Sequence, residues 1–336
     1  MSDAYYMQRC IELARRGAGS AAPNPMVGCV IVHEGNIISE GWHRAPGEAH
    51  AERDAILKLQ NKELLKSSKL YVNLEPCAHT GRTPPCASLI TEYGIPEVVY
   101  GCRDPFTLVD GKGLDHLTQA GVKVTGPVLQ EECEWLNRRF LHFHQKKQPY
   151  IILKWAETAD GFMAPLDGSK KQISGAAAQT LLHKWRSEEQ AIMVGVNTLL
   201  ADTPQLNVRL WHGKSPRPVF IDPQLRGDYR AYPQALVLNA TTDKQEGERR
   251  YMSWNESSIF DCLNQTLYEE NILSVLVEGG KTTLQQLLDA HMWNEIRVIK
   301  SKTATWAAGV SAPHAVGAIV ETLDLNTDTI TIYKKQ

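Results

Sequence analysis

Several features are missing from this sequence, and each absence excludes a class of protein. It contains no run of about 18 apolar residues, so we expect no membrane span. Its first residues, MSDAYYMQRC, lack the basic region and apolar stretch of a secretory signal, which favours the cytoplasm. The formal net charge is only −2, too small to create a basic field for nucleic-acid phosphates. We therefore expect a small-molecule substrate and neither a nucleic-acid nor a membrane partner.

Cysteine is also scarce. The chain has 7 cysteines among 336 residues, an odd number too low for a disulfide framework. In a reducing compartment such thiols are available for metal binding or catalysis. The length suggests two domains, and a hydrophobic content of 43% lets each bury a core.

The order of predicted elements indicates an α/β fold in both halves. In the first half we expect helices at 3–16 (capped by Ser2 or Asp3), from about 50, from about 86, at 114–121 and at 130–145, and strands at 26–32, 36–42, 69–75, 97–102 and 122–126. The basic segment 144–149 marks the boundary between domains 1–146 and 147–336. In the second half we expect helices at 176–189, 260–271 and 282–293, and strands at 149–156, 190–196, 217–223, 234–240, 272–280, 294–301 and 327–335. The polar region 241–258 is predicted to be a mobile loop.

Two motifs of the first half together indicate a metal site. HAE (50–52) opens a predicted helix, and LEPCAHTGRTPPC (74–86) follows a predicted strand. His50, Cys77 and Cys86 offer one imidazole and two thiolates, which suit one Zn²⁺ and leave a fourth position for water. Each cysteine follows a proline, as in the first turn of a helix, where the helix dipole would lower a thiol pKa. Glu52 is then near enough to act as the proton carrier of a hydrolytic reaction.

Other interpretations of these residues remain open. Taken singly, a histidine or cysteine is more often a core or surface residue. A structural zinc would require a fourth protein ligand, for which His79 and His43 are candidates.

The order H-A-E, then P-C, then P-C resembles the zinc nucleobase deaminases. Their cysteines are usually separated by two residues, whereas eight intervene here, and this long insert resembles the pyrimidine deaminases of riboflavin biosynthesis. PNPMVGCVIV (23–32) and RDPFTLVDGKGL (103–114) resemble the same family. The resemblance implies a cytidine-deaminase-like α/β/α domain with Glu52 as the catalytic acid and base. It also implies substrate contacts at Asn24, His43, Arg82 and Asp104.

Some of these residues also have simpler interpretations that involve no substrate. Asn24 lies between two prolines and is typical of a turn, and Arg82 and Asp104 are also typical of solvated loops. Phe106 stands where the family often has Asn.

The second half resembles the reductase half of the same bifunctional family, in LKWAETADGFMA (153–164), in 183–209 and in LVEGG (276–280). This resemblance implies a dihydrofolate-reductase-like domain that uses NADPH. The implied substrate contacts are Arg186, Asp202, Leu206, Arg209 and Glu278, and the implied cofactor contacts are Ala156, Thr198 and the segment from Gly280 onward. The guanidinium groups of Arg186 and Arg209 could also bind a ribose phosphate with paired hydrogen bonds. A salt bridge with a nearby Glu would explain Arg186 equally well.

The reductase half departs from the family in several places. It has Asp202-Thr203-Pro204 in place of Asp-Asp-Pro, and Gln172-Ile173-Ser174 in place of Trp-Ile-Thr. GGKT is not a P-loop because Val275 occupies the position of the first glycine, and no GxGxxG is present.

The sequence therefore predicts a bifunctional enzyme of riboflavin biosynthesis. A zinc domain would deaminate a phosphoribosylaminopyrimidine, and an NADPH domain would reduce its ribosyl group. The family resemblance also leads us to expect a homo-oligomer. Two alternatives remain: a single-function nucleobase or tRNA deaminase with an accessory nucleotide-binding domain, and a zinc-stabilised scaffold that binds a nucleotide.

Overall fold

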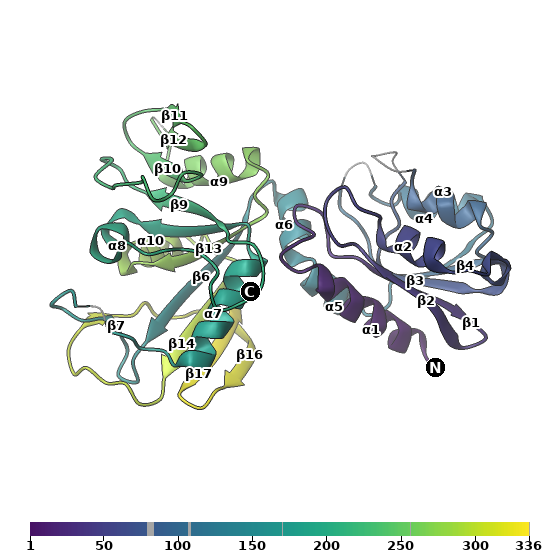
Figure 1. Cartoon of the computed structure of the whole chain (residues 1–336), viewed down its shortest axis with the longest axis horizontal. Coiled ribbons are helices and arrows are strands. Elements are labelled where there is room, and N and C mark those ends of the chain that lie inside the picture. The colour runs from purple at the N-terminus through teal and green to yellow at the C-terminus, as the bar shows by residue number, and fades with distance from the viewer. Residues whose placement is uncertain (79–83, 107–108, 170, 256, 336) are drawn as a thin grey trace. The chain divides into compact units, whose positions relative to one another are not determined.

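The computed structural model describes residues 1–78, 84–106, 109–169, 171–255 and 257–335. The chain divides into two compact units, Met1–Lys147 and Gln148–Gln336, called here the N-terminal and C-terminal units (Figure 1). No helix within the described residues is long and apolar enough to span a bilayer.

The N-terminal unit is built on a mixed sheet of five strands in the order β2-β1-β3-β4-β5. Its strands are β1 (Gly28–His33), β2 (Asn36–Trp42), β3 (Lys69–Leu74), β4 (Glu97–Cys102) and β5 (Lys123–Thr125). β1 is antiparallel to β2 and β3, whereas β3, β4 and β5 are parallel. Because β3 and β4 run in the same direction, the loops that follow them leave the same edge of the sheet.

Helices cover both faces of this sheet (Figure 1). Apolar side chains of α2 (Ala51–Lys58), α3 (Cys86–Glu92) and α4 (Lys112–Gln119) pack on one face. Those of α1 (Asp3–Ala14) and α5 (Gln130–Leu136) pack on the other. The remaining helical elements are η1 (Arg15–Gly17), η2 (Lys62–Ser67) and α6 (Arg138–Lys146). The predicted α/β class is confirmed, and the unit has three layers.

The helix predicted for 130–145 is divided in the structure. α5 ends at Leu136 and α6 begins at Arg138, on either side of Asn137. The buried Asn137 side chain accepts a hydrogen bond from Met26 N and donates one to Met26 O. These bonds to a distant loop explain why the sequence pattern alone did not reveal the break.

The C-terminal unit contains a sheet of ten strands in the order β11-β12-β10-β9-β8-β13-β6-β14-β17-β16. The central strands are parallel, from β12 to β14, and the pairs β14–β17 and β17–β16 are antiparallel. The strands are β6 (Tyr150–Glu157), β8 (Ala191–Gly195), β9 (Arg217–Ile221), β10 (Leu236–Asn239), β11 (Lys244–Glu246), β12 (Arg249–Ser253), β13 (Ser274–Gly279), β14 (Glu295–Ser301), β16 (Ala318–Asp324) and β17 (Asp328–Lys334). β7 (Phe162–Ala164) and β15 (Val310–Ser311) form a separate pair.

Helices again lie on both faces. α9 (Ile259–Glu269) and α10 (Lys281–Asp289) pack on one face, and α7 (Ala176–Glu188) packs on the other, where α8 (Val196–Asp202) also lies. In β6, Ile151 and Leu153 contact the first layer, whereas Tyr150 and Ile152 contact the second. Burial on both faces explains the continuous apolar run of this strand.

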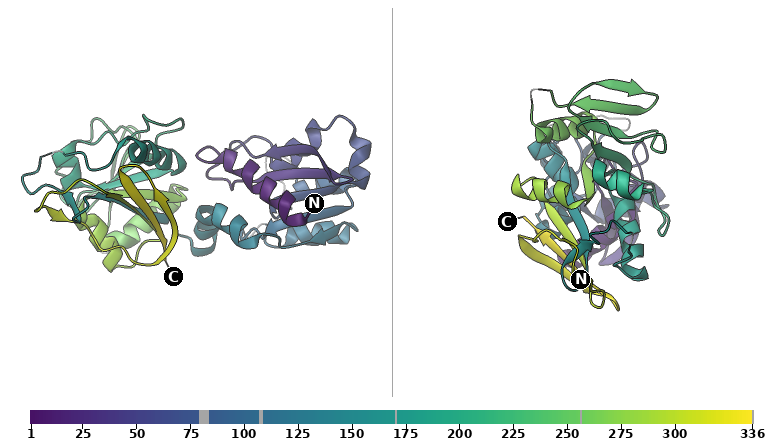
Figure 2. Two further views of the ribbon diagram at one scale, coloured as in Figure 1. Left: turned by 90° about the horizontal axis from the view of Figure 1, so that it is seen from below. Right: turned by 90° about the vertical axis from the view of Figure 1, so that its left-hand side faces the viewer.

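The expectation of a loop at 241–258 was wrong in part. Two strands, β11 and β12, occupy this region and form a hairpin at one end of the large sheet, opposite β16 and β17 (Figure 2). β12 pairs in parallel with β10, and Tyr251 is buried there. The polar residues Lys244–Glu246 form the exposed edge strand, so a polar composition did not distinguish this strand from a loop. α8, β7, β15 and β16 were not predicted.

Candidate active site

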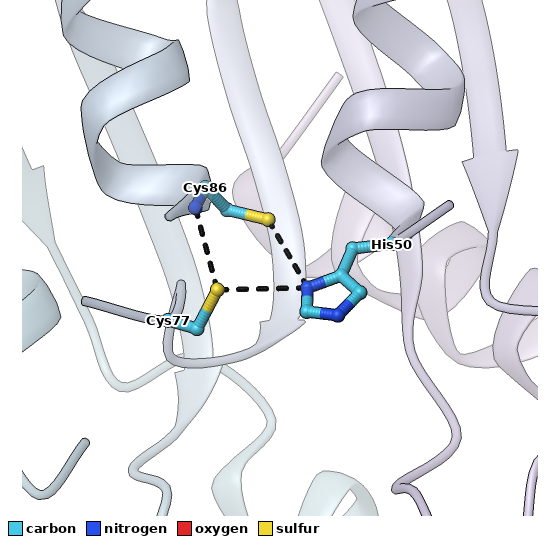
Figure 3. Close-up of side chains that lie close together, drawn as sticks. All are labelled: His50, Cys77 and Cys86. Atoms are coloured by element: carbon cyan, nitrogen blue, oxygen red, sulfur yellow. Dashed lines mark hydrogen bonds between the residues drawn. The ribbon is translucent and has the colours of Figure 1, made fainter. Parts of the chain in front are cut away.

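Three side chains of the N-terminal unit converge from three separate elements (Figure 3). His50 is the N-cap residue of α2, Cys77 follows β3, and Cys86 is the first residue of α3. His50 Nδ1 lies 3.5 Å from Cys77 Sγ and 3.3 Å from Cys86 Sγ. All three potential ligand atoms lie within 4.8 Å of one another, close enough for one ion to contact them all.

The N-terminus of α3 stabilises negative charge on Cys77. The backbone N–H of Cys86 donates to Cys77 Sγ at 3.3 Å, and Ala87 N donates to Cys77 O. A hydrogen bond with the Cys86 thiol, reinforced by His50, lowers the pKa of Cys77 to about 4. The same thiol–thiol bond, together with burial, raises the pKa of Cys86. Cys86 begins α3, as expected. Cys77 does not begin a helix: it lies in a loop and faces the N-terminus of α3.

The described residues offer no fourth protein ligand to this cluster. The ring of His43 lies 5.6 Å from that of His50, but both His43 nitrogens have other partners. Nε2 is 3.0 Å from Asn24 Nδ2, and Nδ1 is 3.1 Å from Ala49 O. The other candidate, His79, lies outside the described residues. A set of one imidazole and two thiols fits Zn²⁺ with an open coordination position.

Glu52 lies in the first turn of α2, two residues after the candidate ligand His50. Its side chain is only 3% exposed, and burial together with the nearby Cys77 raises its pKa to about 7. A carboxyl group with this pKa can both accept and donate a proton near neutral pH, as acid–base catalysis requires.

The predicted pyrimidine contacts are partly brought together. Asn24 and His43 form the side-chain pair described above, and Asp104, 6% exposed, follows β4. Burial raises the pKa of Asp104 to about 7, and Cys77 is among its charged neighbours. Asp104 follows β4 and Cys77 follows the parallel strand β3, so both lie at the same edge of the sheet. Arg82 lies outside the described residues.

Two buried asparagines that we did not single out hold the loop that carries Asn24. Asn73, in β3, accepts from Gly28 N and donates to Met26 O. Asn137 accepts from Met26 N and donates to the same Met26 carbonyl oxygen. A polar Asn within the otherwise apolar run 70–74 was the signal available in the sequence.

In the C-terminal unit, Arg186 and Glu278 form a buried bidentate ion pair. Arg186 Nε and Nη2 donate to the two carboxylate oxygens of Glu278 at 2.6 and 2.8 Å. Lys154 Nζ lies 3.9 Å from Glu278, and Lys154 is itself 8% exposed. Burial opposes the charge on Glu278, but Lys154 and Arg186 outweigh it and hold the pKa of Glu278 below its ordinary value. We did not single out Lys154, although a lysine within the apolar run of β6 was a signal.

The remaining predicted substrate contacts lie on one stretch, 202–209, which begins at the last residue of α8. Arg186 Nη1 donates to Asn207 O, so the buried ion pair is tied to this stretch. Leu206 is 2% exposed, whereas Asp202 and Arg209 are exposed. Arg209 is held at its backbone N–H by His183 Nδ1. The salt bridge of Arg186 is made with Glu278 of β13, and not with a neighbouring Glu on its own helix.

The predicted cofactor contacts lie near the ends of parallel strands. Ala156 is in the last part of β6, and Gly280 follows β13 as the N-cap of α10. Thr198, in the first turn of α8, approaches Gly280 closely: a Cβ on Gly280 would lie 3.0 Å from Thr198 Oγ1. The carboxyl ends of parallel strands are where α/β sheets bind nucleotides.

Comparison with known proteins accounts for both units. The model of the cytidine and deoxycytidylate deaminase zinc-binding region matches residues 1–102, and that of the RibD C-terminal domain matches residues 149–301. The riboflavin biosynthesis protein RibD of Escherichia coli is 42% identical over 322 residues, covering 89% of this chain and 87% of the relative. That of Actinobacillus pleuropneumoniae is 40% identical over 316 residues, covering 88% and 82%. The chain belongs to the RibD family.

Solved RibD structures share this architecture along the whole chain. RibD from Acinetobacter baumannii (form 1) matches with a TM-score of 0.90 at 32% identity, covering 99% of both chains. A diaminohydroxyphosphoribosylaminopyrimidine deaminase/5-amino-6-(5-phosphoribosylamino)uracil reductase from Thermotoga maritima matches with a TM-score of 0.90 at 33% identity, with the same coverage. The predicted bifunctional enzyme of riboflavin biosynthesis, a deaminase and a reductase, is confirmed. The alternatives of a single-function deaminase and of a non-enzymatic scaffold are not supported.

The ligand set predicts how zinc content responds to substitution. We expect about one zinc ion per wild-type chain, and loss of that ion in His50→Ala and Cys86→Ser, because two remaining ligands hold zinc poorly. His43→Ala should retain it, since both His43 nitrogens are engaged elsewhere. Metal analysis of the purified proteins measures this. Loss of zinc from a folded His43→Ala protein would show that His43 is a fourth ligand.

Proposed function

We propose that the N-terminal unit deaminates 2,5-diamino-6-(5-phosphoribosylamino)pyrimidin-4-one by hydrolysis, and that the C-terminal unit reduces the ribosyl group of the resulting aminouracil to ribityl with NADPH. The convergence of His50, Cys77 and Cys86 beside a buried Glu52 carries the first assignment. The family membership supports the order of the two reactions.

His50, Cys77 and Cys86 would hold one zinc ion. When bound, zinc lowers the pKa of water toward 7 and so supplies a nucleophile at neutral pH. Glu52 takes the proton of the attacking water and transfers it to the pyrimidine ring nitrogen. It then carries a second proton to the departing ammonia, and the ring carbon becomes the carbonyl of the uracil.

Other residues of the N-terminal unit orient the substrate. Asn24 and His43 contact its polar edge, and the pair they form restricts both side chains. Burial lowers the pKa of His43 and so favours the neutral ring, whose Nε2 can accept from Asn24 Nδ2. Asp104 accepts from an amino group of the substrate, and Arg82 contributes charge for its phosphate.

In the C-terminal unit, the sugar lies against the Arg186–Glu278 pair. The open-chain imine or aldehyde form of the ribose is the hydride acceptor in this proposal. Glu278, Asp202 and Leu206 position the substrate, and Lys154 compensates the charge of Glu278. Arg209 binds the phosphate with its exposed guanidinium.

NADPH supplies the hydride when bound. Ala156, Thr198 and the turn at Gly280 are the residues we propose to hold it. The N-cap of α10 has no side-chain hydrogen bond, so backbone N–H groups there are available to a cofactor phosphate. We place the enzyme in the cytoplasm, where NADPH is available and the thiol ligands stay reduced.

Glu52→Gln should retain zinc but lower the rate of ammonia release by about 10²–10⁴-fold, because the amide cannot carry the proton. Ammonia release and zinc content are measured on the same sample, with the exposed Glu48→Gln as control. NADPH consumption with the aminouracil substrate should be unchanged. Normal ammonia release by Glu52→Gln would refute its catalytic role.

Arg209→Ala should raise the KM of the reductase for the aminouracil phosphate about tenfold or more, because a charge-assisted bond to phosphate is lost. NADPH absorbance follows this reaction. Arg230→Ala removes another exposed arginine and should have no effect. A KM unchanged by Arg209→Ala would contradict phosphate binding there.

We further propose that two copies of this chain associate through β16. In this edge strand Ile319 is 61% exposed and Val320 is 38% exposed. Val316, two residues before the strand, is 44% exposed. An exposed apolar edge strand is a template for pairing with another chain.

Ile319→Lys should convert the dimer into a monomer, because a buried unpaired charge opposes association. Light scattering measures the mass in solution. Leu166→Lys changes another exposed aliphatic side chain, serves as the control and should remain dimeric. A dimer that persists in Ile319→Lys would place the interface elsewhere.

A further inference from the structure

Glu75 is a buried carboxylate beside the metal cluster to which the proposed chemistry assigns no role. It follows the last residue of β3 and precedes the ligand Cys77 by two positions. Its exposure is 3%, and its backbone N–H donates to Cys102 O at 2.9 Å. The side chain therefore lies where the loops after β3 and β4 begin.

Both oxygens of Glu75 bind backbone N–H groups at the start of α4. Oε2 accepts from Gly111 N at 3.1 Å, and Oε1 accepts from Gly113 N at 3.0 Å and from Leu114 N at 3.5 Å. Gly111 is the N-cap residue of α4 and has no side chain of its own to cap the helix. Glu75, which follows β3, therefore caps α4 from outside the helix. The helix dipole favours a negative charge at this position.

α4 also packs directly against the metal-ligand loop. A Cβ on Gly113 would lie 1.8 Å from Pro76 O, so no larger residue fits between the helix and this loop. Asp104, the proposed substrate contact, follows β4 and accepts a hydrogen bond from Phe106 N. Phe106 O in turn accepts from Val109 N at 2.7 Å and from Asp110 N at 3.1 Å, directly before Gly111 at the Glu75 carboxylate. These bonds connect the Asp104 segment, residues 103–106, to the start of α4.

We propose that Glu75 is a positioning residue of the deaminase, which holds the Asp104 segment in register with the ligand Cys77. The same five-residue stretch, Asn73–Cys77, thus supplies a metal ligand and fixes the distance from the metal to a substrate contact. This inference rests on the proposed role of Asp104. A purely structural cap would affect stability alone, whereas a positioning residue also acts on substrate binding through Asp104.

The test combines Glu75→Ala, Glu75→Gln and Asp104→Asn in the full-length enzyme. We expect Glu75→Ala to retain zinc and to raise the KM for the diaminopyrimidine about tenfold or more, since several hydrogen bonds to a charged group are lost. Glu75→Gln keeps one acceptor oxygen and should show a smaller increase. Zinc content, kcat and KM of ammonia release are measured together.

Glu97→Gln is the matched control. Glu97 begins β4, at the opposite end of the sheet, and pairs with Lys69 and Lys123. Its substitution also replaces a carboxylate with an amide in the same unit, and it should leave the KM within about twofold of wild type, as for a surface pair.

A double-mutant cycle separates positioning from simple stability. If Glu75 acts through Asp104, Glu75→Ala should raise the KM less than about twofold further when Asp104 is already Asn. The proposal would be overturned if the increases in KM caused by the two substitutions multiply in the double mutant. It would also be overturned if Glu75→Ala has the wild-type KM or loses its zinc. If Glu75→Ala does not fold, Glu75→Gln takes its place in the cycle. A normal KM in Asp104→Asn alone would instead refute the substrate contact on which the inference rests.

Discussion

The N-terminal site depends on the requirement that polar groups buried at the end of β3 find partners. Asn73, Glu75 and Cys77 alternate along this stretch, and each engages a different part of the chain. Asn73 binds the loop that carries Asn24, Glu75 binds the start of α4, and Cys77 accepts from the start of α3. An unpaired buried polar group costs about 1–3 kcal/mol, so these bonds also fix the loops that they reach.

Burial acts to raise the pKa of the site carboxylate in both units, but the charged neighbours decide the net shift. Glu52 has the negative charge of Cys77 nearby, and its pKa rises to about 7. Glu278 is also largely enclosed but lies between Lys154 and Arg186, and its pKa falls. The first group can therefore exchange a proton near neutrality, whereas the second remains a fixed negative charge. This difference matches a proton carrier in one site and an orienting group in the other.

Some elements could be predicted because their signal is local. The alternation of strands and helices, the cap at Ser2 and the glycine turn before α10 are encoded in short windows. The break at Asn137, the strand β12 and the buried Lys154 were missed, because each is stabilised by a distant part of the chain. Asn137 binds Met26, β12 pairs with β10, and Lys154 faces Glu278.

The sequence alone identified the ligand types, their order and the neighbouring Glu52, because zinc chemistry restricts which residues can occur at such a site. Only the tertiary structure decided that Cys77 faces the N-terminus of α3, that His43 is paired with Asn24, and that Glu75 binds the start of α4. Ligand identity is a property of single side chains. Their mutual distances depend on how α2, β3 and α3 pack together, and residues far apart in the chain determine that packing.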